Sequence, residues 1–138
     1  MKILFLTVNT HGGLIHYLSQ LANSLANTED IVIIAPIGVQ KEFFSNRVRI
    51  VELCLGNTKK NFLLNIIFFP SCIHFLKCIF RESPDIIHIQ EPSLWWCLFL
   101  PFLFKKPIIY TIHDVHPHLG SRKINQLMGM KILTHYSQ

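Results

Sequence analysis

The chain has 138 residues, of which 50% are hydrophobic and 15% are charged, so its composition excludes a disordered polymer and suits a single domain with one core. The net charge is +5, and residues 92–138 carry five Lys/Arg against Asp114 alone. Such an excess suits phosphate groups or an anionic membrane surface as partners, although basic residues more often only solvate the exterior. Nucleic acid is not favoured, because no zinc-finger, homeodomain or RNA-binding motif is present.

The first elements are a strand, a helix and two more strands. Residues 2–8 (KILFLTV) are apolar on both faces, which is typical of a strand in a parallel sheet covered on both sides. This segment lacks a small-residue cleavage site, so it is predicted to be a strand and not a signal peptide. Residues 13–27 repeat apolar side chains at helical spacing. Strands are predicted again at 31–35 and 48–53.

The next helix is predicted over residues 60–82, with a kink at Pro70. Its polar residues recur at three- and four-residue spacing, so they form one stripe on an otherwise apolar helix. These residues are Ser71, His74, Lys77 and Arg81. Such interruptions argue against a membrane span, which needs about 20 largely unbroken apolar residues.

The remaining elements continue the alternation of strands and helices. Strands are predicted at 86–90, 108–112 and 132–136, and helices at 93–104, where Pro101 bends or ends the helix, and at 121–129. We interpret the apolar helices as packing on the sheet. Attachment to a membrane surface stays open, because the Trp95-Trp96 pair, the phenylalanines and the lysines suit a bilayer interface.

This order predicts one doubly wound α/β (Rossmann-like) domain over residues 1–138, with a mostly parallel sheet. Ligands of such sheets bind beyond the carboxyl ends of the strands. Three polar clusters follow predicted strands and should meet there: "NTHGG" after the first, "EP" after the fourth and "HDVHPH" after the fifth. We therefore expect the functional site at this edge.

Gly12 and Gly13 lead into the first helix. Glycines at this position permit a positive φ and let the N–H groups of a helix N-terminus approach an anion. The pattern matches neither a dinucleotide fingerprint nor a P-loop. A tight strand-to-helix turn explains the two glycines about as well as a phosphate site does.

The histidine-rich loop could in principle hold a metal, because imidazole and carboxylate are zinc ligands. Its candidate ligands are His113, Asp114, His116 and His118. A row of ligands on one loop rarely closes a tetrahedron, so we expect no metal and no cofactor. His88, within a strand, is expected to be a core histidine or one that supports its neighbours.

The four cysteines are far apart and form no CxxC pair, so we expect them to be reduced and packed among apolar neighbours. With no signal peptide, this predicts a cytoplasmic protein, with peripheral attachment to the cytosolic face of a membrane left open.

Taken in order, these motifs resemble a known family. The strand, "GG" and "YLSQLANSLAN", then "PDIIHIQEP" and "KPIIYTIHD", are similar to the N-terminal domain of family 4 glycosyltransferases, retaining enzymes of GT-B fold that use nucleotide-sugars. The resemblance covers nearly the whole chain. A flavodoxin-like or other small-molecule-binding domain is the weaker alternative, since the Gly-Gly loop lacks a Ser/Thr-rich phosphate cradle.

The resemblance implies roles for particular residues. Gly12 and Gly13 would place backbone amides near the phosphates or the transferred sugar, and His113 would contact the donor sugar. Asp114 would shape that loop, and His16 and Glu91 would face the acceptor.

The resemblance also implies partners. The donor is a nucleotide-sugar, and the expected acceptor is a lipid-linked glycan or a polysaccharide. A GT-B enzyme grips the nucleotide diphosphate with a second domain, so the 138 residues are expected to be an N-terminal domain cut short at its C-terminal end and inactive alone. The alternative is that the chain is a non-catalytic subunit of a split two-chain transferase. Such a subunit would bind the acceptor or anchor the enzyme to a membrane.

Overall fold

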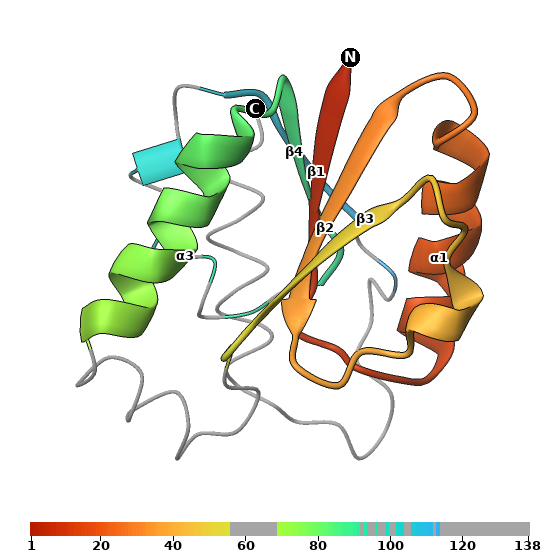
Figure 1. Cartoon of the computed structure of the whole chain (residues 1–138), viewed down its shortest axis with the longest axis horizontal. Coiled ribbons are helices and arrows are strands. Elements are labelled where there is room, and N and C mark those ends of the chain that lie inside the picture. The colour runs from red at the N-terminus through yellow and green to blue at the C-terminus, as the bar shows by residue number, and fades with distance from the viewer. Residues whose placement is uncertain are drawn as a thin grey trace.

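The computed structural model describes residues 1–55, 69–91, 93, 96, 99, 102–103, 106–111 and 113 (Figure 1). A five-stranded parallel sheet in the order β3-β2-β1-β4-β5 stands between α1 on one face and α3 on the other. The predicted doubly wound α/β fold is confirmed. The predicted elements at 121–129 and 132–136 lie outside the described residues.

The elements follow the predicted order. They are β1 (Lys2–Leu6), α1 (Gly13–Leu25), β2 (Asp30–Pro36), the 3-10 turn η1 (Lys41–Phe43), β3 (Arg49–Leu53), α3 (Phe69–Glu82), β4 (Ile86–Ile89) and β5 (Ile108–Tyr110). Between β4 and β5, residues 96, 99, 102 and 103 are helical, as predicted for 93–104. Pro70 is the second residue of α3 as described; residues 60–68 of the predicted helix, on which the predicted kink at Pro70 depends, lie outside the described residues.

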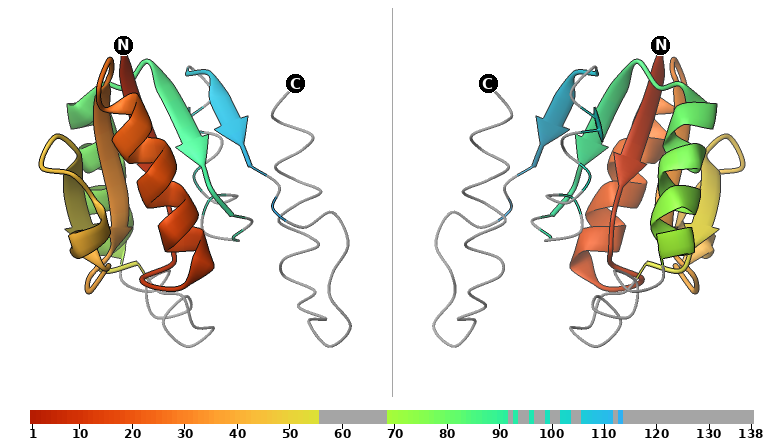
Figure 2. Two further views of the ribbon diagram at one scale, coloured as in Figure 1. Left: turned by 90° about the vertical axis from the view of Figure 1, so that its right-hand side faces the viewer. Right: turned by 90° about the vertical axis from the view of Figure 1, so that its left-hand side faces the viewer.

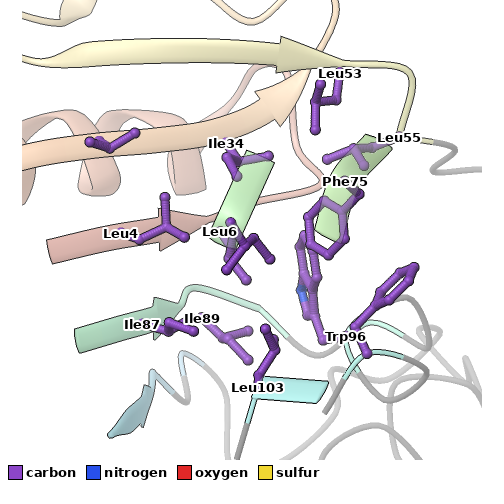
Figure 3. Close-up of a cluster of buried hydrophobic side chains, with 13 residues drawn as sticks. Leu4, Leu6, Ile34, Leu53, Leu55, Phe75, Ile87, Ile89, Trp96 and Leu103 are labelled. Carbon is purple, nitrogen blue, oxygen red and sulfur yellow. The ribbon is translucent and has the colours of Figure 1, made fainter. Parts of the chain in front are cut away.

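Side chains of the strands alternate between two apolar layers because both faces of the sheet are covered. On the α3 face, Leu6 and Ile89 pack against Phe75 and Ile79 of the helix (Figure 3). Trp96 is fully buried in this layer, with its ring centroid 5.9 Å from that of Phe75. The suggestion that Trp96 meets a membrane is therefore wrong; Trp95 lies outside the described residues.

The second apolar layer lies between the sheet and α1. Phe5 and Ile33 pack there against Ile15, Leu18 and Ala22, which share one face of the helix. This packing fixes α1 across the sheet, so that the N-terminus of α1 lies beside the carboxyl end of β1 (Figure 1).

The polar stripe of α3 is confirmed for His74, Lys77 and Arg81, which are exposed. Ile73 and Phe80 are exposed on the same helix, Phe80 at 63%. Within the described residues, no helix is both long and apolar enough to cross a membrane. Cys54 is exposed after β3, so the expectation that it packs in the core is wrong.

Candidate functional site

The carboxyl ends of β1, β4 and β5 lie next to one another along one edge of the sheet (Figure 2). Leu6 pairs with Ile89, and Ile89 pairs with Tyr110, so the segments that follow these three strands begin at the same level. The N–H groups of Gln90 and Thr111 continue the pairing, with Leu6 O at 3.1 Å and Ile89 O at 3.0 Å as acceptors. The polar clusters after β1, β4 and β5 therefore start together, as predicted.

The turn at Gly12 starts α1. Gly12 has φ 87° and ψ −170°, a conformation that is essentially restricted to glycine, and its carbonyl accepts the N–H groups of Ile15 and His16 at 3.0 and 3.2 Å. Among the described residues, no side chain caps this helix end, and its first turn carries no acidic residue. Both glycines are exposed. The first N–H groups of α1 thus form an open end that attracts an anion.

His113, after β5, is exposed and meets the first turns of α1. Its ring packs edge-on against Tyr17, with 4.8 Å between centroids. Tyr17 is 43% exposed and lies one helical turn beyond Gly13, so it joins the His113 loop to the Gly12–Gly13 turn. The sequence analysis missed Tyr17, although its position four residues after Gly13 indicated the same end of the helix.

His16 is also exposed, but it lies apart from the pair formed by Tyr17 and His113. Its ring packs against Phe43 of η1, with 4.2 Å between centroids. Successive residues of a helix point about 100° apart, so the rings of His16 and Tyr17 contact different segments.

Glu91 is buried directly after β4, with 5% of its surface exposed. Its Oε1 accepts the backbone N–H of Val8, and the side chains of Thr7 and Asn9 also hydrogen-bond to it. Its Oε2 has no hydrogen-bond partner among the described residues. Burial raises the pKa of Glu91 to about 7, against smaller opposing effects of the Val8 N–H, Thr7 and Asn9.

His88 lies in β4 beneath the site. Its Nε2 is 2.7 Å from Thr111 Oγ1, and its ring lies 4.8 Å from that of Phe5. Burial, and then the positive charge of His113, lower the pKa of His88 to about 4, so the imidazole is neutral at pH 7. This agrees with the expectation of a core histidine that supports its neighbours.

In the part of the chain that the structure describes, no three His, Cys, Asp or Glu side chains gather as metal ligands would. Of the histidine-rich loop, only His113 is described; Asp114, His116 and His118 lie outside the described residues.

Comparisons with known proteins agree with the fold. The family model named Glycosyltransferase Family 4 matches residues 11–137, from the His11-Gly12-Gly13 turn nearly to the last residue. No curated protein matched the sequence. Because the family model covers almost the whole chain and the sheet is that of a Rossmann-like domain, the chain belongs to the N-terminal domain family of family 4 glycosyltransferases.

Proposed function

We propose that this domain is the acceptor-side half of a retaining transferase that moves a sugar from a nucleotide-sugar to a lipid-linked or polysaccharide acceptor. The observation that carries the proposal is the N-terminus of α1, which begins at the Gly12 turn beside the ring pair of Tyr17 and His113 and which no side chain of the described residues caps. Negative charge develops on the leaving phosphate during such a transfer, and preorganised N–H donors stabilise it.

Each residue of the site has a proposed role. The amides at Gly12 and Gly13 approach the phosphates or the transferred sugar, and His113 contacts the donor sugar, with Asp114 shaping its loop. His16 and Glu91 stand on the acceptor side, His16 as an exposed contact and Glu91 from beneath the loop after β1. No metal is needed, because the partner domain supplies most of the charge that balances the phosphates.

The test is a His113→Ala variant assayed with a donor domain of the same family and a water-soluble acceptor. We expect kcat to fall by about a hundred-fold or more, because the side chain contacts the reacting sugar. The free energy of unfolding should change by less than about 0.5 kcal/mol, since His113 is exposed.

His74→Ala is the matched control. His74 is an exposed histidine on α3, on the opposite face of the sheet from α1. Equal losses of activity in both variants, or none in either, would contradict the role of His113.

Donor affinity provides a second test. One helix N-terminus and one histidine offer few charge-assisted contacts for a diphosphate. We therefore expect the 138 residues alone to bind nucleotide-sugars no more tightly than about 1 mM, roughly 4 kcal/mol, and to transfer no sugar. Micromolar binding in calorimetry, or measurable transfer, would show that the donor site does not depend on a partner domain or subunit.

We also propose that the domain touches an anionic membrane surface through α3. The exposed side of this helix combines Ile73 and Phe80 with Lys77 and Arg81, a mixture that suits a bilayer interface. This contact also favours the second candidate function, a membrane-anchoring or acceptor-binding subunit of a two-chain transferase.

Vesicle flotation tests the membrane contact. We expect binding to vesicles rich in phosphatidylserine at low salt and release at high salt, because screening weakens the attraction to the basic residues. Binding that is equal on neutral vesicles, or absent at low salt, would contradict it.

A further inference from the structure

Glu91 completes the sheet where backbone pairing stops. Successive N–H groups of a strand point to opposite sides, and that of Thr7 bonds to Ile34 O of β2 at 3.1 Å. The next N–H, that of Val8, therefore points toward β4, which ends at Ile89. The carboxyl group of Glu91 takes the place of a β4 carbonyl and accepts this N–H.

The consequence reaches the Gly12 turn. The segment between Thr7 and Gly12 starts between two fixed points, Ile34 O on one side and the Glu91 carboxyl on the other. Farther along, Thr10 O accepts the N–H of Gln40 at 3.0 Å. These contacts hold the short path from β1 to the helix N-terminus, so we expect a displacement of Val8 to be passed on to the amides at Gly12 and Gly13.

Direct contact between Glu91 and a substrate is a poorer account of this geometry. Oε1 is already engaged with the Val8 N–H, and Oε2 is shielded from solvent. Burying a carboxyl group without a charged partner costs stability, which a Leu or Gln at this position would avoid. The presence of a buried carboxyl group at the edge that carries the site therefore points to a role in shaping the loop.

We propose that Glu91 is a positioning residue, which sets the orientation of the Gly12–Gly13 amides by holding the N–H of Val8. The inference rests on the proposed function for what those amides bind, but the coupling of Glu91 to the turn can be measured without any substrate.

The experiment compares Glu91→Gln and Glu91→Leu by NMR spectroscopy of the 138-residue chain. Gln keeps a side-chain oxygen for the Val8 N–H, whereas Leu removes it. We expect hydrogen exchange at Val8 to accelerate about ten-fold or more in Glu91→Leu and by less than about three-fold in Glu91→Gln. The amide resonances of Gly12 and Gly13 should shift in the Leu variant and return toward their original positions in the Gln variant.

Glu52→Leu is the matched control for Glu91→Leu. The Oε1 atom of Glu52 also accepts a loop N–H, that of Gly38 at 2.9 Å, in the turn after β2. This control should shift Gly38 and leave Gly12 and Gly13 in place. Unmoved Gly12 and Gly13 resonances in Glu91→Leu, with only a lower melting temperature, would overturn the inference by showing a purely structural role.

A measurement on the unchanged chain covers the case in which Glu91→Leu does not fold. The chemical shifts of the Gly12 and Gly13 amides should change with pH as the Glu91 carboxyl titrates. This part of their pH dependence should vanish in Glu91→Gln. The groups that act on Glu91 from the β1 segment, Thr7, Val8 and Asn9, are uncharged. The other groups near the turn are the same in both proteins, so any contribution that they make remains.

If the pH dependence of the Gly12 and Gly13 resonances is the same in Glu91→Gln as in the original chain, the coupling is contradicted. If the coupling is confirmed but the chain transfers no sugar when it is assayed with a donor domain, the proposed function is contradicted and the role of Glu91 is not.

Discussion

His88 and Glu91 lie three residues apart at the end of β4, and burial displaces their pKa values in opposite directions. Burial disfavours the charged form of each group, so the pKa of the imidazole falls to about 4 and that of the carboxyl rises to about 7. In both cases the neutral form is favoured, which keeps net charge out of the sheet beneath the site.

We expect Glu91→Gln to change how stability depends on pH. The folded chain binds the Glu91 proton more tightly than the unfolded chain does, so this group stabilises the fold fully below pH 4.5 and loses that contribution as the pH rises through 7. A pKa change from 4.5 to about 7 corresponds to roughly 3 kcal/mol. Urea unfolding should show the variant gaining up to that amount relative to the original chain between pH 4.5 and 8. A difference that stays constant with pH would contradict the raised pKa.

His88→Gln should reveal a slope of the opposite sign. The pKa of His88 is lowered from 6.5 to about 4, so its contribution to stability is present above pH 6.5 and is lost as the pH falls toward 4. The pH range over which His88 acts overlaps that of Glu91, so the contributions of the two groups to stability offset each other in the original chain. Removing His88 should leave a stability that declines from pH 4.5 to 7, measured by the same urea titrations. A profile unchanged from the original chain would argue against the lowered pKa.

The two glycines of the turn should respond differently to alanine. A Cβ at either position meets no atom of the described residues within 4 Å, so we expect the difference to come from the backbone. At Gly12, where φ is 87°, alanine should cost about 1–3 kcal/mol. At Gly13, inside the helix, it should be neutral or stabilise by up to about 1 kcal/mol. Equal effects in thermal unfolding would mean that the turn does not keep this conformation.

At the scale of elements, α3 separates a buried side from an exposed one within two adjacent residues. Ile79 is 2% exposed in the layer shared with Phe75 and Trp96, whereas Phe80 is 63% exposed. Ile79→Ala should lower the free energy of unfolding by about 2–5 kcal/mol, and Phe80→Ala by less than about 0.5 kcal/mol. Denaturant unfolding measures both. If Phe80→Ala reduced vesicle binding without loss of stability, the exposed face of α3 would be a membrane contact. A large loss of stability in Phe80→Ala would instead show that Phe80 is buried.

The sequence predicted the strands well because their apolar residues fill both faces of the sheet. It failed at the end of β1, which was predicted to reach residue 8 but stops at Leu6. The reason is not local: β4 ends at Ile89, and a side chain from Glu91 replaces the backbone partner of Val8. Hydropathy along the chain does not contain that information.

The position of the candidate site could also be predicted from the sequence, but its side-chain contacts could not. The convergence of the Gly12–Gly13 turn and the segments after β4 and β5 followed from parallel strands, which end at a common edge. The edge-on contact of Tyr17 with His113 and the burial of Glu91 depend on packing between segments that are distant in the sequence. They required the three-dimensional structure.

At the scale of the whole molecule, the ends of the sheet differ in chemistry. The amino ends of the strands carry ion pairs. They include the α-amino group of Met1 with Glu29 at 2.6 Å, Lys2 with Asp30 at 3.5 Å and Arg49 with Glu82. The carboxyl ends carry the glycine turn, the buried Glu91 and the exposed His113. Ion pairs thus fasten the amino ends of these strands, and one more, Lys41 with Glu52, lies near the carboxyl end of β3. The amides and rings after β1 and β5 are left for ligands.

The central position of β1 has a consequence for synthesis on the ribosome. β1 is made first, yet the residues that complete its second edge, Asp85 for Lys2 and Glu91 for Val8, each lie 83 positions later. At about 5–20 residues per second, the nascent chain presents this open edge for roughly 4–17 s. We expect translation halted after residue 85 to yield a product that sediments or binds a holdase chaperone, to a greater extent than the 138-residue product does. Equal recovery of both in the soluble fraction would show that β1 finds another partner while it waits for β4.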